Sequence, residues 1–292
     1  MFRGTYTALV TPFRNGEVDV EAFERLIEAQ IAGGISGIVP VGTTGESPTL
    51  SLGERHHIIE LAVKTARGRC QVIAGTGSNS TRDAIAHTKE AEEIGADGAL
   101  LVAPYYNKPS QEGLFCHFAA IAEATSLDLM LYNIPGRCAV DIAADTVVRL
   151  ARDHANIVSI KEASGSVDRV SELVCRLPDR CTVLSGDDCL TLPFLSVGAV
   201  GVVSVASNLF PAQVVQLVRL FLEGEAQEAR QLHQKFFPLF KDIFLEPNPV
   251  PAKTILCWRG EMAADCRLPL VEMSAANQER LRKTLHELEA GL

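Results

Sequence analysis

The residue best placed for covalent chemistry is Lys161, which ends an apolar run from Ile157 to Ile160 and precedes a small, flexible turn. Burial removes water from an ammonium group, lowers its pKa and favours the neutral amine. A neutral amine can condense with a ketone to form a Schiff base. The commoner case is a lysine that reaches solvent where its strand stops. This segment alone favours the solvated lysine, so the rest of the chain must supply partners that handle a carbonyl.

Other side chains that could contact a carbonyl or a carboxylate lie in or just after similar apolar runs. They are Thr43, Thr44, Asn79, Tyr105, Tyr106, Tyr132, Arg137, Asp187, Asp188, Val203 and Ser204. The turn from Gly42 to Glu46 could present N–H groups and two hydroxyls to an anion, or could serve turn geometry alone. The Asp187–Asp188 pair could bind a metal, but no histidine lies near it, so a helix cap is favoured.

Tyr132 and Arg137 also have ordinary structural explanations. Tyr132 could close the end of a barrel with its hydroxyl in water, and Arg137 could be a surface charge. Arg137, however, follows a Pro-Gly turn, where a bidentate grip on a carboxylate would make sense. Each alternative is the stronger one when its residue is taken singly. The joint occurrence of these residues at equivalent ends of consecutive runs favours a functional site.

The elements that must position these residues alternate between strand and helix eight times. The expected strand ends are Thr11, Val41, Ala74, Val102, Tyr132, Lys161, Leu184 and Val205, most of them about 30 residues apart. That spacing is one βαβ unit, and eight such units with right-handed crossovers predict a (β/α)8 TIM barrel. An open doubly wound sheet is the alternative, but it normally carries a phosphate fingerprint after its first strand, which is absent here. In a barrel, Tyr132 and Lys161 should lie on adjacent strands and face one lumen.

The alternation stops near residue 226. Helical patterns over 227–244, 251–258 and 275–289 predict a C-terminal three-helix appendage. We therefore expect a barrel domain over residues 1–225 and a helical region over 226–292.

Composition excludes several functions. The 292 residues carry a net charge of −9, and no basic stripe is available to neutralise the phosphates of a nucleic acid. No segment approaches 18 uninterrupted apolar residues, and the N-terminal apolar run is too short for a signal peptide. The eight cysteines include no C-x-x-C pair, so zinc spacing is absent and reduced thiols are expected. These features predict a cytoplasmic protein that has no contact with nucleic acid or membrane.

An ordered set of motifs resembles the class I, pyruvate-dependent lyases built on (β/α)8 barrels. Within them the likeness is greatest to the dihydrodipicolinate synthase family. The segments that carry the resemblance are VGTTGES (41–47), PYYNKPSQEG (104–113), YNIPGR (132–137), IKEA (160–163), SGDD (185–188) and EPNP (246–249). The resemblance runs over nearly the whole chain, and the ordered set is far more specific than any single motif.

The resemblance implies a role for each matching residue. Lys161 would form the Schiff base with pyruvate, and Tyr132 would shuttle protons through Thr43 to Tyr106 of a neighbouring subunit. The pyruvate carboxylate would be bound by Thr43 and Thr44, with Val203 lining the pocket, and Arg137 would hold the second substrate, L-aspartate 4-semialdehyde. The product would be 4-hydroxy-tetrahydrodipicolinate, the entry step of diaminopimelate and lysine biosynthesis. The family implies a homotetramer, a dimer of dimers, and a homodimer is the alternative.

The chemistry itself requires no metal and no organic cofactor, because the lysine is the electron sink. A tyrosine can act as both acid and base if a cation or hydrogen bonds lower its pKa from about 10. Other Schiff-base aldolases, such as N-acetylneuraminate lyase, 2-keto-3-deoxy-sugar aldolases and 4-hydroxy-2-oxoglutarate aldolase, would keep Lys161 and Tyr132. Arg137 and the Tyr105–Tyr106 pair favour the semialdehyde over a sugar. A non-catalytic barrel should lack the lysine or the tyrosine, and this chain has both.

Some members of the family bind lysine as an inhibitor between two subunits. The matching positions are Ser47, Pro48, Leu50, Leu52, Arg55, Asn79, Asp83 and Tyr105. Leu52 and Arg55 depart from the residues of lysine-sensitive relatives. A guanidinium at Arg55 would repel an ammonium ligand, and Leu52 offers it no hydrogen bond. We therefore expect weak or absent feedback by lysine.

Overall fold

The protein is a closed barrel of eight parallel strands, seen here in a computed structural model that describes residues 1–291. Around the barrel the strands follow the order β1, β10, β9, β8, β7, β6, β5 and β4. Their bounds are β1 Gly4–Ala8, β4 Gly37–Val39, β5 Gln71–Gly75, β6 Gly98–Val102, β7 Asp128–Asn133, β8 Ile157–Glu162, β9 Thr182–Ser185 and β10 Gly201–Ser204. The predicted TIM barrel is confirmed.

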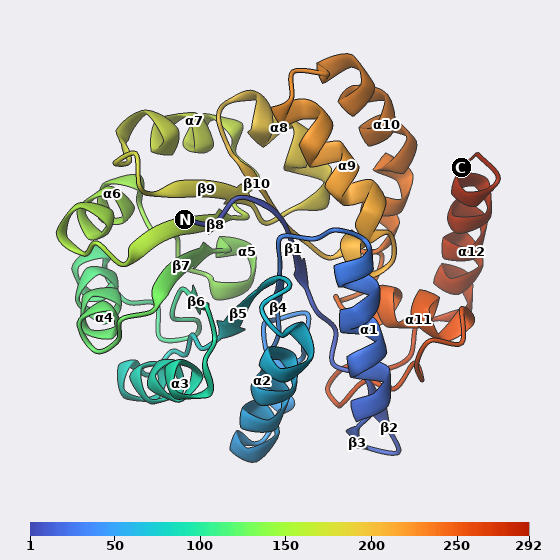
Figure 1. The fold of residues 1–292 in the computed structure, drawn as a ribbon, viewed down its shortest axis with the longest axis horizontal. Coiled ribbons are helices and arrows are strands. Elements are labelled where there is room, and N and C mark those ends of the chain that lie inside the picture. The colour runs from blue at the N-terminus through green and yellow to red at the C-terminus, as the bar shows by residue number, and fades with distance from the viewer. Residues whose placement is uncertain (292) are drawn as a thin grey trace.

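Helices between the strands form an outer ring, as Figure 1 shows. They are α1 Val20–Ala32, α2 Leu52–Ala66, α3 Thr81–Ile94, α4 Gln111–Glu123, α6 Ala144–Asp153, α7 Val167–Arg176, α8 Thr191–Ser196 and α9 Pro211–Leu222. Several start at side-chain caps that the sequence signals. Ser51 accepts a hydrogen bond from the Glu54 N–H, and the Glu54 carboxylate accepts one from the Ser51 N–H, which is a capping box at the start of α2.

Apolar side chains fill two separate layers. One cluster fills the barrel lumen and includes Phe2, Tyr6, Met130, Tyr132 and Val203. A larger cluster lies between the strands and the surrounding helices. A strand of such a barrel is therefore buried on both faces, which is why its sequence is apolar almost throughout. A charged residue on such a strand must have a partner or a function.

The C-terminal helices are α10 Ala226–Asp242, α11 Val250–Trp258 and α12 Ala275–Glu289. α10 packs against α9 of the barrel and against α12, and Figure 1 shows α11 and α12 beside the barrel rather than in its ring. The three-helix C-terminal segment is thus confirmed, whereas the domain boundary at residue 225 stays a prediction.

Several short elements were not predicted. A small hairpin, β2 Phe13–Arg14 and β3 Glu17–Val18, follows β1. The segment expected to be a turn after Asn133 contains a single helical turn, α5 Pro135–Cys138, with proline at its first position. Within residues 1–291, no helix is both long and apolar enough to cross a membrane.

Candidate active site

Lys161 lies inside the barrel rather than in solvent. Its side chain is on β8, which continues one residue further than predicted, and only 5% of the residue is exposed. Tyr132 on β7 pairs with it directly in the strand register. The Lys161 Nζ is 4.2 Å from the centre of the Tyr132 ring. The prediction that the two side chains are neighbours in one lumen is confirmed, and the solvated alternative is wrong.

The surroundings of Lys161 favour a free amine. The pKa of Lys161 is lowered from 10.5 to about 8; burial is the main cause, the Asp188 carboxylate partly opposes it, and the positive charge of Arg137 adds to the lowering. At pH 7 a lysine with a pKa of about 8 is about 10% neutral, against about 0.03% for an unperturbed lysine. The site therefore holds a much larger share of the lysine as the nucleophilic amine than an exposed lysine would have at the same pH.

The loop after β9 holds Lys161 in place. A Cβ on Gly186 would lie 3.0 Å from Cε and 3.1 Å from Cγ of Lys161, so glycine lets the lysine side chain lie flat across the loop backbone. Asp187 caps the short turn that follows, because its carboxylate accepts a hydrogen bond from the Cys189 N–H at 2.8 Å. This agrees with the helix cap that the sequence favours over a metal site. Within residues 1–291, no cluster of His, Cys, Asp and Glu could hold a metal ion.

The neighbouring residue, Asp188, is buried with its carboxylate aimed at the end of β10. It accepts hydrogen bonds from the N–H groups of Val205 and Ala206 at 3.0 and 3.1 Å, and from the Ser204 hydroxyl. Burial raises the pKa of Asp188 to about 6, and these three hydrogen bonds oppose the shift. Sequence analysis named Asp188 but did not find this role, because the donors lie sixteen or more residues further along the chain.

The pKa of Tyr132 is raised rather than lowered, although a lowered pKa would let a tyrosine act as both acid and base. Burial raises the pKa of its phenol above the usual 10, and the nearby Arg137 charge and a hydrogen bond with Thr43 only partly oppose that shift. The condition under which Tyr132 could act as both acid and base, a lowered pKa, is therefore not met in the site as this chain forms it. The phenol stays protonated at neutral pH, so it is a proton donor before it can be a base.

The turn from Gly42 to Glu46 is held by the C-terminal helical segment. The Asn248 amide donates a hydrogen bond to Oγ1 of the buried Thr44 at 2.9 Å. Lys253 on α11 forms an ion pair with Glu46 at 2.6 Å, and the side chains of both are at most 1% exposed. The second Glu46 oxygen accepts the Arg267 N–H at 2.9 Å. The motif EPNP pointed to Asn248, but nothing local in the sequence signalled Lys253.

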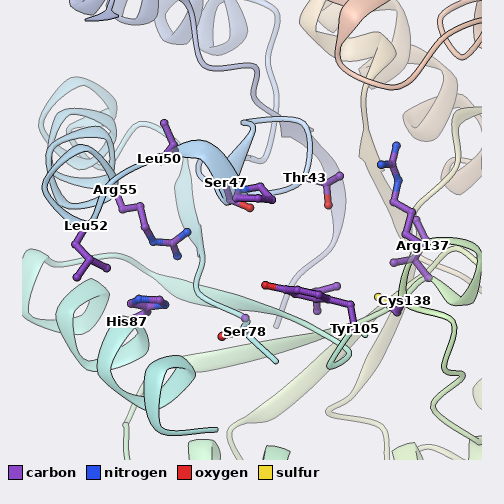
Figure 2. Close-up of a pocket in the computed structure, with 14 residues that line it drawn as sticks. Thr43, Ser47, Leu50, Leu52, Arg55, Ser78, His87, Tyr105, Arg137 and Cys138 are labelled. Atoms are coloured by element: carbon purple, nitrogen blue, oxygen red, sulfur yellow. The ribbon is translucent and has the colours of Figure 1, made fainter. Parts of the chain in front are cut away.

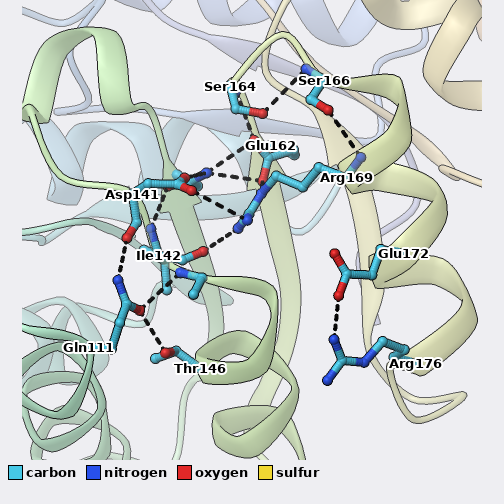
Figure 3. Close-up of polar contacts among 12 residues, drawn as sticks. Gln111, Asp141, Ile142, Thr146, Glu162, Ser164, Ser166, Arg169, Glu172 and Arg176 are labelled. Atoms are coloured by element: carbon cyan, nitrogen blue, oxygen red, sulfur yellow. Dashed lines mark hydrogen bonds and ion pairs between the residues drawn. The ribbon is translucent and has the colours of Figure 1, made fainter.

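A second polar network links the end of β7 to the end of β8, at the residues that follow Tyr132 and Lys161 (Figure 3). The Asn133 amide donates to Asp141 at 2.7 Å and to Glu162 at 3.1 Å. The Arg169 Nε donates to the other Glu162 oxygen at 2.8 Å. Glu162 is fully buried, and its ion pair with Arg169 offsets the free-energy cost of burying the carboxylate charge. The network fixes the strand ends that carry Tyr132 and Lys161.

A cavity of about 370 Å³ opens at this end of the barrel (Figure 2). Thr43, Ile134, Arg137 and Cys138 line one end of it, next to Tyr132. Lys161, Tyr132 and Thr44 are buried and do not line it, and Val203 is buried in the lumen at 1% exposure. Tyr106 is also outside the cavity and is 90% exposed.

The residues matched to a lysine-binding site divide into two groups. Six of them line the same cavity: Ser47, Pro48, Leu50, Leu52, Arg55 and Tyr105. Asn79 and Asp83 are not part of the lining. Asn79 donates to the Tyr105 carbonyl at 3.3 Å, and Asp83 is bound to Arg82 and to the Ser80 cap of α3. His87, which sequence analysis missed, lines the cavity instead.

A parallel (β/α)8 barrel with a desolvated lysine beside a phenol at its carboxyl end is typical of the lyases that form a Schiff base with their substrate. Comparison with known proteins narrows this class. The model of the dihydrodipicolinate synthetase family matches residues 1–288, and the chain belongs to that family.

Individual relatives are similar in sequence to this chain along nearly its full length. The 4-hydroxy-tetrahydrodipicolinate synthase of Syntrophobacter fumaroxidans is 52% identical, and that of Endomicrobium trichonymphae is 50% identical, each over 98% of both chains. The solved structure of the 4-hydroxy-tetrahydrodipicolinate synthase from Methylacidiphilum fumariolicum SolV is 60% identical with a TM-score of 0.98. That match covers 99% of this chain and 97% of the other. The chain is a lyase of this family, as predicted, and the comparisons do not support the sugar-aldolase alternative.

Proposed function

We propose that the chain condenses pyruvate with L-aspartate 4-semialdehyde through a Schiff base on Lys161 and releases 4-hydroxy-tetrahydrodipicolinate. The observation that carries this proposal is the buried Lys161 amine, with a pKa of about 8, next to the Tyr132 ring. The names of the relatives support the choice of substrates. The reaction serves diaminopimelate and lysine biosynthesis, and we propose a cytoplasmic location for it.

The proposed reaction balances without a cofactor. The Lys161 Nζ adds to the ketone carbon of pyruvate, and the resulting hydroxyl leaves as water to give an iminium. The iminium acidifies the pyruvate methyl group, which loses a proton and becomes an enamine. The enamine carbon then bonds to the aldehyde carbon of the semialdehyde. Finally the semialdehyde amino group attacks the iminium carbon and displaces the lysine amine as the ring closes, so that one water is released overall.

The neighbouring side chains have complementary roles in this scheme. The protonated Tyr132 donates the proton with which the hydroxyl leaves, and Thr43, its hydrogen-bond partner, passes protons onward. Thr44 accepts a hydrogen bond from Asn248, so its own O–H remains free to donate to the pyruvate carboxylate. Val203 provides an apolar wall. Arg137, at the cavity mouth, binds the carboxylate of the semialdehyde.

We further propose that Tyr106 acts in the site of a neighbouring subunit, within a homodimer or a homotetramer. A tyrosine that is 90% exposed and held at a φ of 72° projects away from its own barrel. Mixing Tyr106→Ala and Lys161→Ala chains tests this role. If subunits share the site, a 1:1 mixture regains about a quarter of wild-type activity by statistical pairing. Activity no greater than the sum of the two separate variants would contradict it.

The substrate assignment is tested with purified protein by following both substrates by NMR. We expect pyruvate and L-aspartate 4-semialdehyde to disappear in equal amounts, and the Lys161→Ala variant to consume neither while remaining folded. Cleavage of N-acetylneuraminate or a 2-keto-3-deoxy sugar, without loss of the semialdehyde, would contradict the proposal.

A further inference from the structure

Arg55 on α2 is a buried cation without a carboxylate partner in residues 1–291. The residue is 8% exposed, and its guanidinium makes one hydrogen bond, from Nη2 to the Gly75 carbonyl at 2.9 Å. A guanidinium has five N–H donors, and a buried charge is costly unless it is paired. Arg169, which is partly buried and serves structure, follows that rule because it pairs with the Glu162 carboxylate. Arg55 therefore has unused capacity for an anion.

The groups that face Arg55 compensate its charge only in part, and none of them forms an ion pair with it in residues 1–291. Glu90 is the carboxylate that acts on it most, but its Oε1 is 2.9 Å from Nδ1 of His56, and Glu90 does not line the cavity. His87 lies beside Arg55, and burial together with the Arg55 charge lowers the His87 pKa, so this histidine stays neutral at pH 7. Tyr105 is the other titratable neighbour. The charged side chain that lines this end of the cavity is therefore a cation, Arg55.

The cavity has two ends of different character (Figure 2). Arg55, His87 and Leu52 lie at one end, Thr43, Arg137 and Cys138 at the other, and Ser47 and Tyr105 lie between them. Leu50 and Leu52 give the Arg55 end an apolar wall. A ligand there meets a guanidinium on one side and aliphatic carbon on the other.

We propose that the Arg55 end of the cavity binds a small organic anion, a carboxylate with a short apolar body. The carboxylate accepts hydrogen bonds from the free N–H groups of Arg55, and the aliphatic part packs on Leu50 and Leu52. This chemistry is the reverse of that needed for an ammonium ligand. The inference rests on the cavity alone and does not depend on the proposed function.

Isothermal titration calorimetry with isovalerate tests the proposal, with isoamylamine as a cation of similar size. We expect wild-type protein to bind isovalerate but neither isoamylamine nor lysine. Arg55→Gln should weaken isovalerate binding about tenfold or more, because it removes charge-assisted hydrogen bonds. Arg55→Lys keeps the charge and should retain part of the affinity, and circular dichroism checks that both variants fold. Thr44→Val, which alters the catalytic end, should bind isovalerate like wild type.

Three results would overturn the proposal. The first is equal isovalerate affinity in Arg55→Gln and wild type. The second is loss of binding in Thr44→Val but not in Arg55→Gln, which would place the anion at the catalytic end. The third is no binding at tens of millimolar, as expected if a carboxylate of a second copy of the chain already pairs with Arg55. None of these readouts uses catalytic activity, so failure here is distinct from failure of the proposed condensation.

Discussion

Replacing Lys253 tests how strongly the ion pair between the C-terminal helical segment and the turn after β4 stabilises the protein. Lys253 on α11 and Glu46 in the turn after β4 form an ion pair of 2.6 Å, and both side chains are at most 1% exposed. Lys253 also lies over the Phe13 ring, with Nζ 4.4 Å from the ring centre. Lys253→Met keeps the length and the apolar stem of the side chain but leaves a buried carboxylate without its cation. The turn beyond that carboxylate carries Thr43 and Thr44.

The expected cost follows from the burial of both charges. Removing one partner of a buried ion pair costs about 3–5 kcal/mol, because the remaining charge is uncompensated. Glu46 keeps the Arg267 N–H as a donor, so we expect the lower end, about 3 kcal/mol, for Lys253→Met. Adding Glu46→Gln removes the second charge. The double variant should therefore be more stable than the sum of the single effects by about 2 kcal/mol.

Urea unfolding monitored by circular dichroism measures these changes, and the midpoint should move without a change of slope. Lys283→Met is the matched control, because Lys283 on α12 is 77% exposed and pairs weakly with Glu287 at 3.9 Å. We expect that control to change stability by at most about 0.5 kcal/mol. A loss below about 1 kcal/mol in Lys253→Met, or strictly additive effects in the double variant, would refute the reasoning.

Three further predictions concern the lysine and its surroundings. Because the neutral Lys161 amine must attack, the rate of imine formation should rise with pH to about 8 and then level off, as stopped-flow measurements with pyruvate would show; a rate still rising steeply above pH 9.5 would indicate an unperturbed lysine. Gly186→Ala should slow imine formation about 10- to 100-fold, since its Cβ would displace Lys161; a wild-type rate would contradict this close packing. Arg137→Ala should raise the KM for the semialdehyde far more than that for pyruvate in steady-state assays, and an unchanged semialdehyde KM would remove its assigned role.

Much of the fold could be predicted because its signals are local. The alternation of apolar runs and amphipathic segments defined the eight repeats, and caps such as Ser51 with Glu54 marked where helices begin. The helix expected over 275–289, α12, begins and ends where it was predicted. The hairpin β2–β3 and the single turn α5 were not predicted, because elements of two to four residues are too short to show a periodic pattern of apolar residues.

The candidate site was predicted in part for the same reason. Lys161 and Tyr132 lie at consecutive strand ends, so the repeat itself makes them neighbours. The contacts that distant segments make with the site, such as the ion pair of Lys253 with Glu46, could not be predicted, because no local pattern links residues 207 positions apart. The direction of the Tyr132 pKa shift could not be predicted, because it depends on burial in three dimensions, which the types of the neighbouring residues do not reveal.

The central claim is that Lys161 forms a covalent imine with pyruvate. The most direct test is to incubate the full chain with pyruvate, reduce with borohydride and locate the product by peptide mass spectrometry. We expect one reduced pyruvyl adduct per chain on Lys161, and none in Lys161→Ala. An unmodified Lys161 peptide, or an adduct spread over exposed lysines, would contradict it.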